Sequence, residues 1–104
     1  MNKYVVVLST AGSARQAQRI AKLLLKRKVA GCVNLIPRID SWYWWQGRIE
    51  HGKEFLLVIK TSSRHLNELG RLLKANHSYQ TPELIALPIQ WGDRSYLGWL
   101  DQTL

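Results

Sequence analysis

The chain has 104 residues, of which 46% are hydrophobic, and its fifteen lysines and arginines against seven acidic residues give a formal net charge of +8. This length corresponds to a single domain, expected to span residues 1–104, with enough apolar residues for a core that needs no metal or disulfide. The longest apolar runs hold about five residues, far short of the roughly 20 that a membrane-spanning helix requires, so no membrane partner is expected.

The N-terminal third predicts a buried strand followed by an amphipathic helix. Lys3–Thr10 contains a continuous run of valine and leucine, which is typical of a strand buried on both faces. Ser13 and Gln16 form a capping box, and good helix formers continue until Val29, with apolar residues at helical spacing. Six basic residues occupy the polar side of this helix: Arg15, Arg19, Lys22, Lys26, Arg27 and Lys28.

The cationic side of this helix has two interpretations. A solvated helix surface is the ordinary one, and we prefer it to a surface for nucleic acid or for anionic membranes. A nucleic-acid partner is therefore not expected. An RNA-binding domain stays open as an alternative, because the net charge is positive and aromatic residues that could stack on bases are abundant.

A long β-hairpin is predicted in the middle of the chain. Val29–Ile36 is apolar and rich in β-branched residues, and Pro37 can begin a bend or bulge. An aromatic arm then extends to a turn near Gln46–Gly47, and Glu54–Lys60 returns as the third strand.

The arm of this hairpin carries aromatic side chains on both faces. Alternation along a strand puts Tyr43 and Trp45 on one face and Trp42 and Trp44 on the other. A single small domain rarely covers both faces of such an arm. The pattern therefore predicts that a second copy of the protein covers one of them.

The last third of the chain predicts two helices and a fourth strand. Thr61–Ser62 offers N-cap chemistry to a helix whose inward stripe runs over Leu66–Leu73. Leu84–Ile89 is the fourth strand, and Asp93 can cap a short closing helix that buries residues 96, 97 and 100. The predicted order of elements is βαββαβ, with a long hairpin between the second and third strands and a short C-terminal helix. This order is typical of the α+β class with a ferredoxin-like arrangement. Both main helices then cover one sheet face, and self-association should close the other.

Several spaced segments occur in one order between Tyr4 and Leu100. They are Ala30–Asn34, Ile39–Ile49, Glu54, Ile59–Thr61, His77–Ile85 and Tyr96–Leu100. Together they resemble the CutA divalent-cation tolerance family. The resemblance implies a ferredoxin-like subunit in a homotrimer, a hairpin that reaches between subunits, a cytoplasmic location, and an association with copper and other divalent cations.

The resemblance also implies where a metal would bind. Some bacterial members carry a cysteine where this chain has Ser9, and two histidines and a proline where it has Asn76-His77-Ser78. These positions are the copper ligands proposed for those members, and a hydroxyl and a carboxamide replace them poorly. We therefore expect at most weak binding of Cu(II) or another divalent cation, with His77 and Cys32 as candidate ligands. For Cys32 we prefer the role of a small buried hydrophobe to that of a ligand. For His77 a structural role beside the helix dipole is weighed equally with metal ligation.

A pocket between subunits is the other candidate site. Its expected residues are Trp45, Glu54, Lys60, Tyr79 and Glu83. A Lys–Glu pair at a strand end is usually a structural ion pair, so no catalytic residue and no enzymatic activity are predicted. The alternative is a trimer that senses a small anion or nucleotide between subunits, which Lys60 and the Gly12–Ser13 turn suggest.

The expected compartment follows from the cysteine content. Cys32 is the one cysteine of the chain and cannot form an intramolecular bridge. No secretory leader pattern opens the sequence, so a reducing cytoplasm is expected. The predicted function is a trimeric cytoplasmic protein of divalent metal tolerance or response, with no chemistry of its own.

Overall fold

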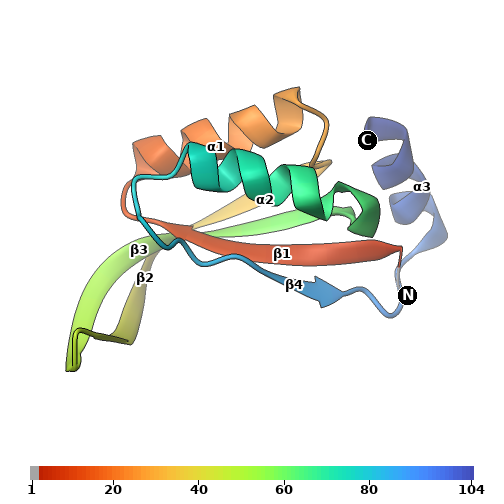
Figure 1. Cartoon of the computed structure of the whole chain (residues 1–104). Coiled ribbons are helices and arrows are strands. Elements are labelled where there is room, and N and C mark those ends of the chain that lie inside the picture. The colour runs from red at the N-terminus through yellow and green to blue at the C-terminus, as the bar shows by residue number, and fades with distance from the viewer. Residues whose placement is uncertain (1–2) are drawn as a thin grey trace.

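Four strands and three α-helices alternate along residues 3–104, the part of the chain that the computed structural model describes (Figure 1). The elements are β1 (Tyr4–Ala11), α1 (Ala14–Lys26), β2 (Cys32–Trp45), β3 (Arg48–Ser62), the short 3-10 helix η1 (Ser63–His65), α2 (Leu66–Ala75), β4 (Ile85–Pro88) and α3 (Arg94–Thr103). The predicted order of strands and helices is confirmed, and with it the α+β ferredoxin-like class. Within residues 3–104, no helix combines the length and apolar character needed to cross a membrane.

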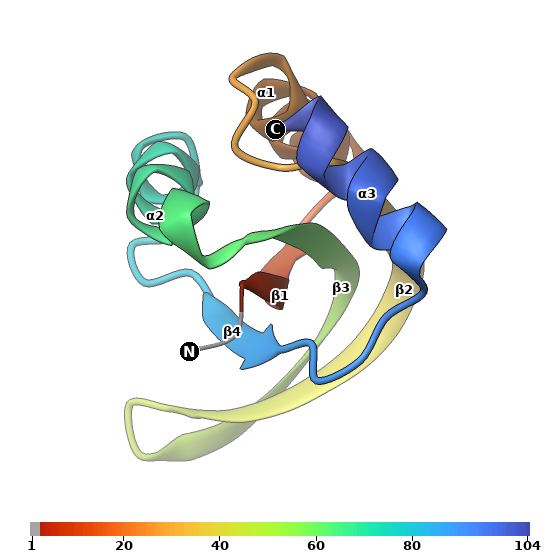
Figure 2. The same cartoon turned by 90° about the vertical axis from the view of Figure 1, so that its right-hand side faces the viewer.

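The strands form one antiparallel sheet in the order β2-β3-β1-β4. In the register of this sheet, Val7 of β1 lies between Ile59 of β3 and Ala86 of β4. Figures 1 and 2 show α1 and α2 side by side on one face of the sheet and α3 beside the end of β2. The hairpin of β2 and β3 extends beyond the sheet and curves beneath its other face (Figure 2).

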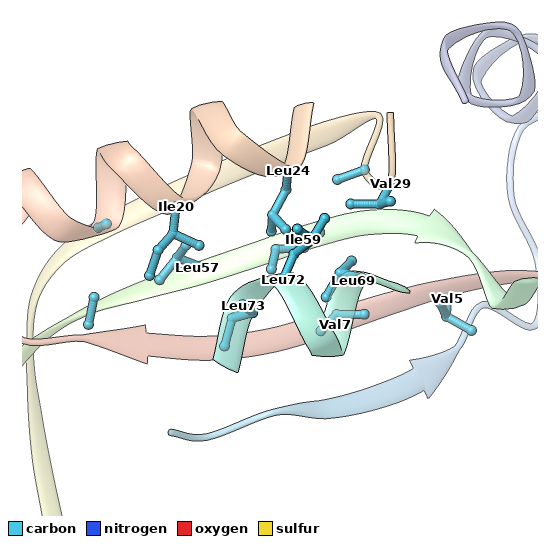
Figure 3. Close-up of a cluster of buried hydrophobic side chains, with 13 residues drawn as sticks. Val5, Val7, Ile20, Leu24, Val29, Leu57, Ile59, Leu69, Leu72 and Leu73 are labelled. Atoms are coloured by element: carbon cyan, nitrogen blue, oxygen red, sulfur yellow. The ribbon is translucent and has the colours of Figure 1, made fainter. Parts of the chain in front are cut away.

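The core lies between this sheet and the two helices (Figure 3). Because side chains alternate along a strand, the residues of β1 and β3 with odd numbers face the helices. Its largest fully buried apolar side chains are Val7, Ile20, Leu24, Leu57, Ile59, Leu69 and Leu73. Burying each contributes roughly 1.5–3 kcal/mol, which makes this interface the main source of stability.

Helix α1 begins as predicted and ends earlier than the pattern of helix formers suggests. At its start, the Ser13 hydroxyl accepts a hydrogen bond from the Gln16 N–H. At its end, Lys28 adopts φ of 60°, and the N–H groups of Lys28 and Val29 donate to the carbonyls of Leu25 and Leu24 at 3.1 Å. This is a Schellman-type end, in which a lysine takes the left-handed position that glycine usually occupies.

The expectation that Thr61–Ser62 caps α2 is wrong. The Thr61 hydroxyl is buried and donates to the Val29 carbonyl at 2.7 Å, which ties β3 to the segment before β2. The Ser62 hydroxyl lies 2.7 Å from Nδ1 of His65, so it is engaged with a side chain instead of the helix backbone. Helix α2 therefore begins only at Leu66, after η1.

His65 makes the stability of the fold depend on pH. Burial, and secondly the charge of Arg64, lower the pKa of His65 below its ordinary 6.5. The unfolded chain thus binds this proton at a higher pH than the folded chain does. The contribution of His65 to the free energy of unfolding should therefore be complete above pH 6.5. It should diminish as the pH falls below that value.

A His65→Gln variant should show a flatter decline in the free energy of unfolding between pH 6.5 and 5 than the parent protein. Urea titrations at several pH values in this window measure it. The carboxylates whose pKa is lowered by their partners, those of Asp40, Glu68 and Asp101, lose their contribution only near pH 4 and below. Equal slopes in the variant and the parent would contradict the prediction.

Helix α3 closes the end of the sheet. The Asp93 carboxylate accepts from the Tyr96 N–H at 3.1 Å, as predicted. The Tyr4 hydroxyl donates to the Asp101 carboxylate at 2.5 Å, which fastens α3 to β1. Leu100 is fully buried, but the expected burial of Tyr96 is wrong, because 40% of it is exposed. Its ring packs on Trp99 at the surface instead.

The sheet face away from the helices is apolar. Opposite residues in an antiparallel pair project to the same side, so Leu8, Val58 and Ile85 share this face. We call it the open face, and its apolar residues are Val6, Leu8, Ile36, Leu56, Val58, Ile85 and Leu87. Ile85 and Leu87 are 52% and 49% exposed. An apolar sheet face of this kind is typical of a surface that another protein chain covers.

The hairpin has the predicted turn and bulge. Gln46 and Gly47 have φ of 51° and 77°, the pattern of the type I′ turn that suits a two-residue hairpin. The pairing of β2 with β3 shifts between Ile36 and Ile39, where Arg38 has φ of 58°. This bulge bends the arm out of the plane of the sheet.

Candidate functional site

A groove of about 910 Å³ opens between the hairpin arm and the connector that joins α2 to β4. We call it the arm groove. Its lining residues are Thr10, Asp40, Ser41, Trp42, Tyr43, Trp44, Trp45, Glu54, Tyr79, Gln80, Thr81, Pro82 and Glu83. The bulge in β2 lies at the base of the arm that forms one wall of this groove.

Tyr79 fastens the connector to β3 at the floor of the arm groove. Its hydroxyl donates to the Glu54 carboxylate at 2.9 Å. Burial, and secondly this bond to a carboxylate, raise the pKa of Tyr79 to about 12. The phenol therefore stays protonated at neutral pH and keeps donating. A Cβ at Gly12 would lie 3.1 Å from the Tyr79 hydroxyl, so a glycine at this position leaves room for the ring.

Both ring nitrogens of His77 are occupied by backbone groups. Nε2 lies 2.7 Å from the Thr10 carbonyl, which can only accept, and Nδ1 lies 3.0 Å from the Tyr79 N–H, which can only donate. His77 is therefore neutral in this arrangement, with its proton on Nε2. It links β1 to the connector and has no lone pair left for a metal ion.

Cys32 lies at the other end of the sheet. Cys32 pairs with Lys60 of β3, and Lys60 pairs with Val6 of β1. His77 contacts Thr10, which lies four residues beyond Val6 on β1. Four residues of a strand span about 13 Å. The two predicted metal ligands thus do not form one site. Among residues 3–104, no group of three or more His, Cys, Asp or Glu side chains is placed to hold a metal ion. A first-row transition metal needs several such donors, so the residues present do not fit a resident copper ion.

Ser9 and Asn76 occupy positions where relatives are expected to carry metal ligands. In this chain both side chains donate hydrogen bonds to backbone carbonyls. The Ser9 hydroxyl is buried and donates to the Glu83 carbonyl at 2.7 Å. The Asn76 amide donates to the Leu72 carbonyl at 2.8 Å, at the C-terminal end of α2. Both positions therefore have a structural role in this chain.

Four of the five residues predicted for a pocket line the arm groove: Trp45, Glu54, Tyr79 and Glu83. Lys60 does not, because it lies beside Cys32 and its ammonium donates to Asn34. Nine of the thirteen lining residues were not predicted for a pocket, among them Thr10, Ser41 and Gln80. Ser41 was detectable, since strand alternation places it on the face of Tyr43 and Trp45.

The arm groove has the composition of a binding surface. Tyr43 and Trp45 are 47% and 54% exposed and offer ring faces, while Glu54 and Glu83 supply hydrogen-bond acceptors. Apolar walls with a few polar groups are typical of sites that bind small molecules or another chain. Asp40 is engaged elsewhere on the arm, with Lys53 at 2.7 Å and His51 at 2.8 Å.

We expect His77→Ala to lower the free energy of unfolding by about 2 kcal/mol, because it removes two hydrogen bonds and leaves the Thr10 carbonyl without its imidazole partner. Amide exchange at Tyr79 should accelerate as the connector loosens. Urea unfolding and hydrogen exchange measure both effects. Ser78→Ala is the matched control on the same connector, since it removes one exposed hydrogen bond to Gln16 and should cost less than 0.5 kcal/mol. Equal stability of the two variants would show that His77 is not the anchor.

Comparison with known proteins gives consistent matches over the whole chain. The model of a family described as "CutA1 divalent ion tolerance protein" matches residues 5–103. The chain is 43% identical over 104 residues to the divalent-cation tolerance protein CutA of Archaeoglobus fulgidus, covering 100% of this chain and 99% of that protein. It is 44% identical over 100 residues to CutA of Escherichia coli, covering 96% and 89%.

Solved structures agree with these matches. The structure of the periplasmic divalent cation tolerance protein CutA from Archaeoglobus fulgidus is similar with a TM-score of 0.94 and 44% identity, covering 96% of this chain and 97% of that one. The crystal structure of CutA1 from Oryza sativa is similar with a TM-score of 0.95 and 41% identity, covering 98% and 94%.

Proposed function

This chain belongs to the CutA1 divalent ion tolerance family, and we propose that it serves divalent cation tolerance as a cytoplasmic homotrimer without chemistry of its own. The observation that carries the proposal is the pair of uncovered apolar surfaces, the open face and the aromatic arm. Trp42 and Trp44 are 69% and 72% exposed. Contact between chains would remove both surfaces from water.

The kind of assembly follows from the difference between these two surfaces. When the arm of one chain contacts the open face of another, two unlike surfaces meet, and such head-to-tail contacts close into a ring when the rotation between neighbouring chains returns to the first chain. In a ring of three chains, each arm contacts an open face and each open face is covered by an arm. It also brings three arm grooves next to neighbouring chains, where the grooves would lie between subunits.

The donor set supports only weak binding of copper or another divalent cation. His77 is occupied by backbone partners, and Cys32 is a single thiol at the far end of the sheet. Divalent cation tolerance would then depend on the trimer and on the response of the trimer to the cation. It would not depend on a site that holds the cation tightly. Cytoplasmic location is proposed because a reducing compartment keeps the Cys32 thiol free, and cell fractionation tests it.

Native mass spectrometry with and without Cu(II) tests assembly and metal binding together. We expect three times the 12.0 kDa chain mass at micromolar concentration, and no copper retained after desalting. Cys32→Ser and His77→Ala proteins should give the same spectra as the parent. A single well-folded chain would contradict the trimer, and one copper retained per chain would contradict the weak site.

The arm groove does not favour the alternative of a small anion or a nucleotide as ligand. Its charged lining residues are Asp40, Glu54 and Glu83, which are all acidic. Lys60, which suggested an anion site, lies outside the groove. Like charges in a cleft repel an anionic ligand, so a neutral or cationic ligand suits the groove better.

A further inference from the structure

The net charge of the chain is concentrated on the two packed helices. Residues 14–28 and 66–75, which we call the helix layer, contain eight of the fifteen basic residues and one of the seven acidic residues. The acidic residue, Glu68, lies 3.8 Å from Arg27 and 2.6 Å from Arg71, so it is already paired. The rest of the chain is close to neutral. The positive field therefore belongs to one side of the molecule, the upper side in Figure 1.

Four cations form a row along the outer side of α1. Arg15, Arg19, Lys22 and Lys26, which we call the basic stripe, are spaced by four, three and four residues and are all exposed. At 3.6 residues per turn they fall within about 60° of arc and span about 16 Å. Arg19 donates to the Asn76 carbonyl at 2.9 Å. The side chains of the other three make no ion pair or hydrogen bond with any of residues 3–104.

We propose that the basic stripe binds the phosphate backbone of a nucleic acid duplex without sequence preference. A duplex carries one negative charge per about 1.7 Å of its axis, so about ten phosphates lie within the 16 Å of the stripe. Each of the four long side chains can reach one of them. Phosphate contacts position a protein on a duplex and carry no sequence information, which matches a surface of arginine and lysine alone.

A duplex fits this surface better than a single strand. Proteins that hold single strands stack bases on aromatic rings, and the helix layer contains no Phe, Tyr or Trp. The aromatic arm lies on the opposite side of the sheet (Figure 1). A base stacked on the arm could not contact the basic stripe at the same time.

An anionic membrane also fits less well. Helices that lie in a membrane surface insert an apolar face among the lipids. The apolar face of α1, formed by Ala17, Ile20 and Leu24, is buried in the core. The basic stripe can therefore attract a membrane only by its charge. The phosphates of a duplex also occur at regular intervals, as the four cations of the stripe do.

Fluorescence anisotropy with a labelled 24-base-pair DNA duplex of mixed sequence tests the proposal, using the full chain between 50 and 200 mM NaCl. Four phosphate contacts should give a slope of log K against log salt of about −3.6, hence a loss of affinity of about a hundredfold over this range. Lys22→Gln/Lys26→Gln should make the slope shallower by about 1.8. Glutamine is a good helix former, so α1 should persist, and circular dichroism verifies it.

The matched control is Arg48→Gln/Arg94→Gln, which removes the same charge from the hairpin and from the start of α3. Its slope should equal that of the parent, and Lys22→Arg/Lys26→Arg should retain full affinity. Equal losses in the two glutamine variants would overturn the proposal, as would tighter binding to the single strand of the same length. Binding to vesicles of equal phosphatidylglycerol and phosphatidylcholine, with none to the duplex, would assign the stripe to membranes instead.

Discussion

Leu87→Lys is expected to release single chains from the proposed trimer. Leu87 lies on the open face opposite Val6, and 49% of it is exposed in one chain. If another chain covers this face, the substitution buries an ammonium group with no partner, which costs several kcal/mol at each of the three contacts. Sedimentation velocity at micromolar concentration should show the mass falling from three chains to one.

Leu25→Lys is the matched control for this experiment. Leu25 is 42% exposed, but it lies on α1, away from the open face. The same change of residue should leave the mass of the assembly unaltered. Circular dichroism distinguishes a folded single chain from an unfolded one. If the Leu87→Lys protein keeps three chains and the melting temperature of the parent, the open face is not the contact surface.

The sequence predicts well those features that depend on local chemistry. The Ser13 and Asp93 caps and the turn at Gln46–Gly47 each need only a few neighbouring residues. The bulge after Ile36 is also local, since Pro37 cannot donate to the neighbouring strand. These elements fix the order of the fold, so the ferredoxin-like class follows from them.

Two other features differ from the sequence pattern although the residues involved are close in sequence, because residue type alone does not decide between competing local arrangements. Ser62 has the residue type of an N-cap, but the His65 ring competes for its hydroxyl. The end of α1 was missed for another reason, because Lys28 occupies a backbone conformation that ordinarily requires glycine. In both cases one local arrangement replaces another that the residue types also favour.

The candidate site shows the same division. The sequence assigns Trp45 and Glu54 to one pocket, Glu54 because it lies near a strand end, and the arm groove brings the two together. Lys60 is assigned to the same pocket on the same ground, and Cys32 to a metal site from its residue type. Strand register places both at the other end of the sheet. Register determines which polar groups meet, and it becomes visible only when the strands are paired.

Gly31→Ala should lower the free energy of unfolding by about 3 kcal/mol, since overpacking a core contact typically costs 1–3 kcal/mol. The Gly31 N–H donates to the Lys60 carbonyl at 3.0 Å, which fixes the backbone against β3. A Cβ at this position would lie 2.5 Å from the Thr103 hydroxyl and would overlap Cδ1 of Leu100. Leu100 is fully buried and cannot swing aside, so α3 must shift away from the sheet.

Gly98→Ala provides the matched control on α3 itself. A Cβ at Gly98 meets no atom within 4 Å, and alanine is the better helix former by about 1 kcal/mol, so this variant should be more stable than the parent. Urea unfolding at one protein concentration compares all three proteins, because the stability of an assembly depends on concentration. Amide exchange should accelerate in α3 of the Gly31→Ala protein alone. Equal stability of Gly31→Ala and the parent would contradict this prediction. It would mean that α3 is not packed closely enough against the start of β2 to require glycine at this position.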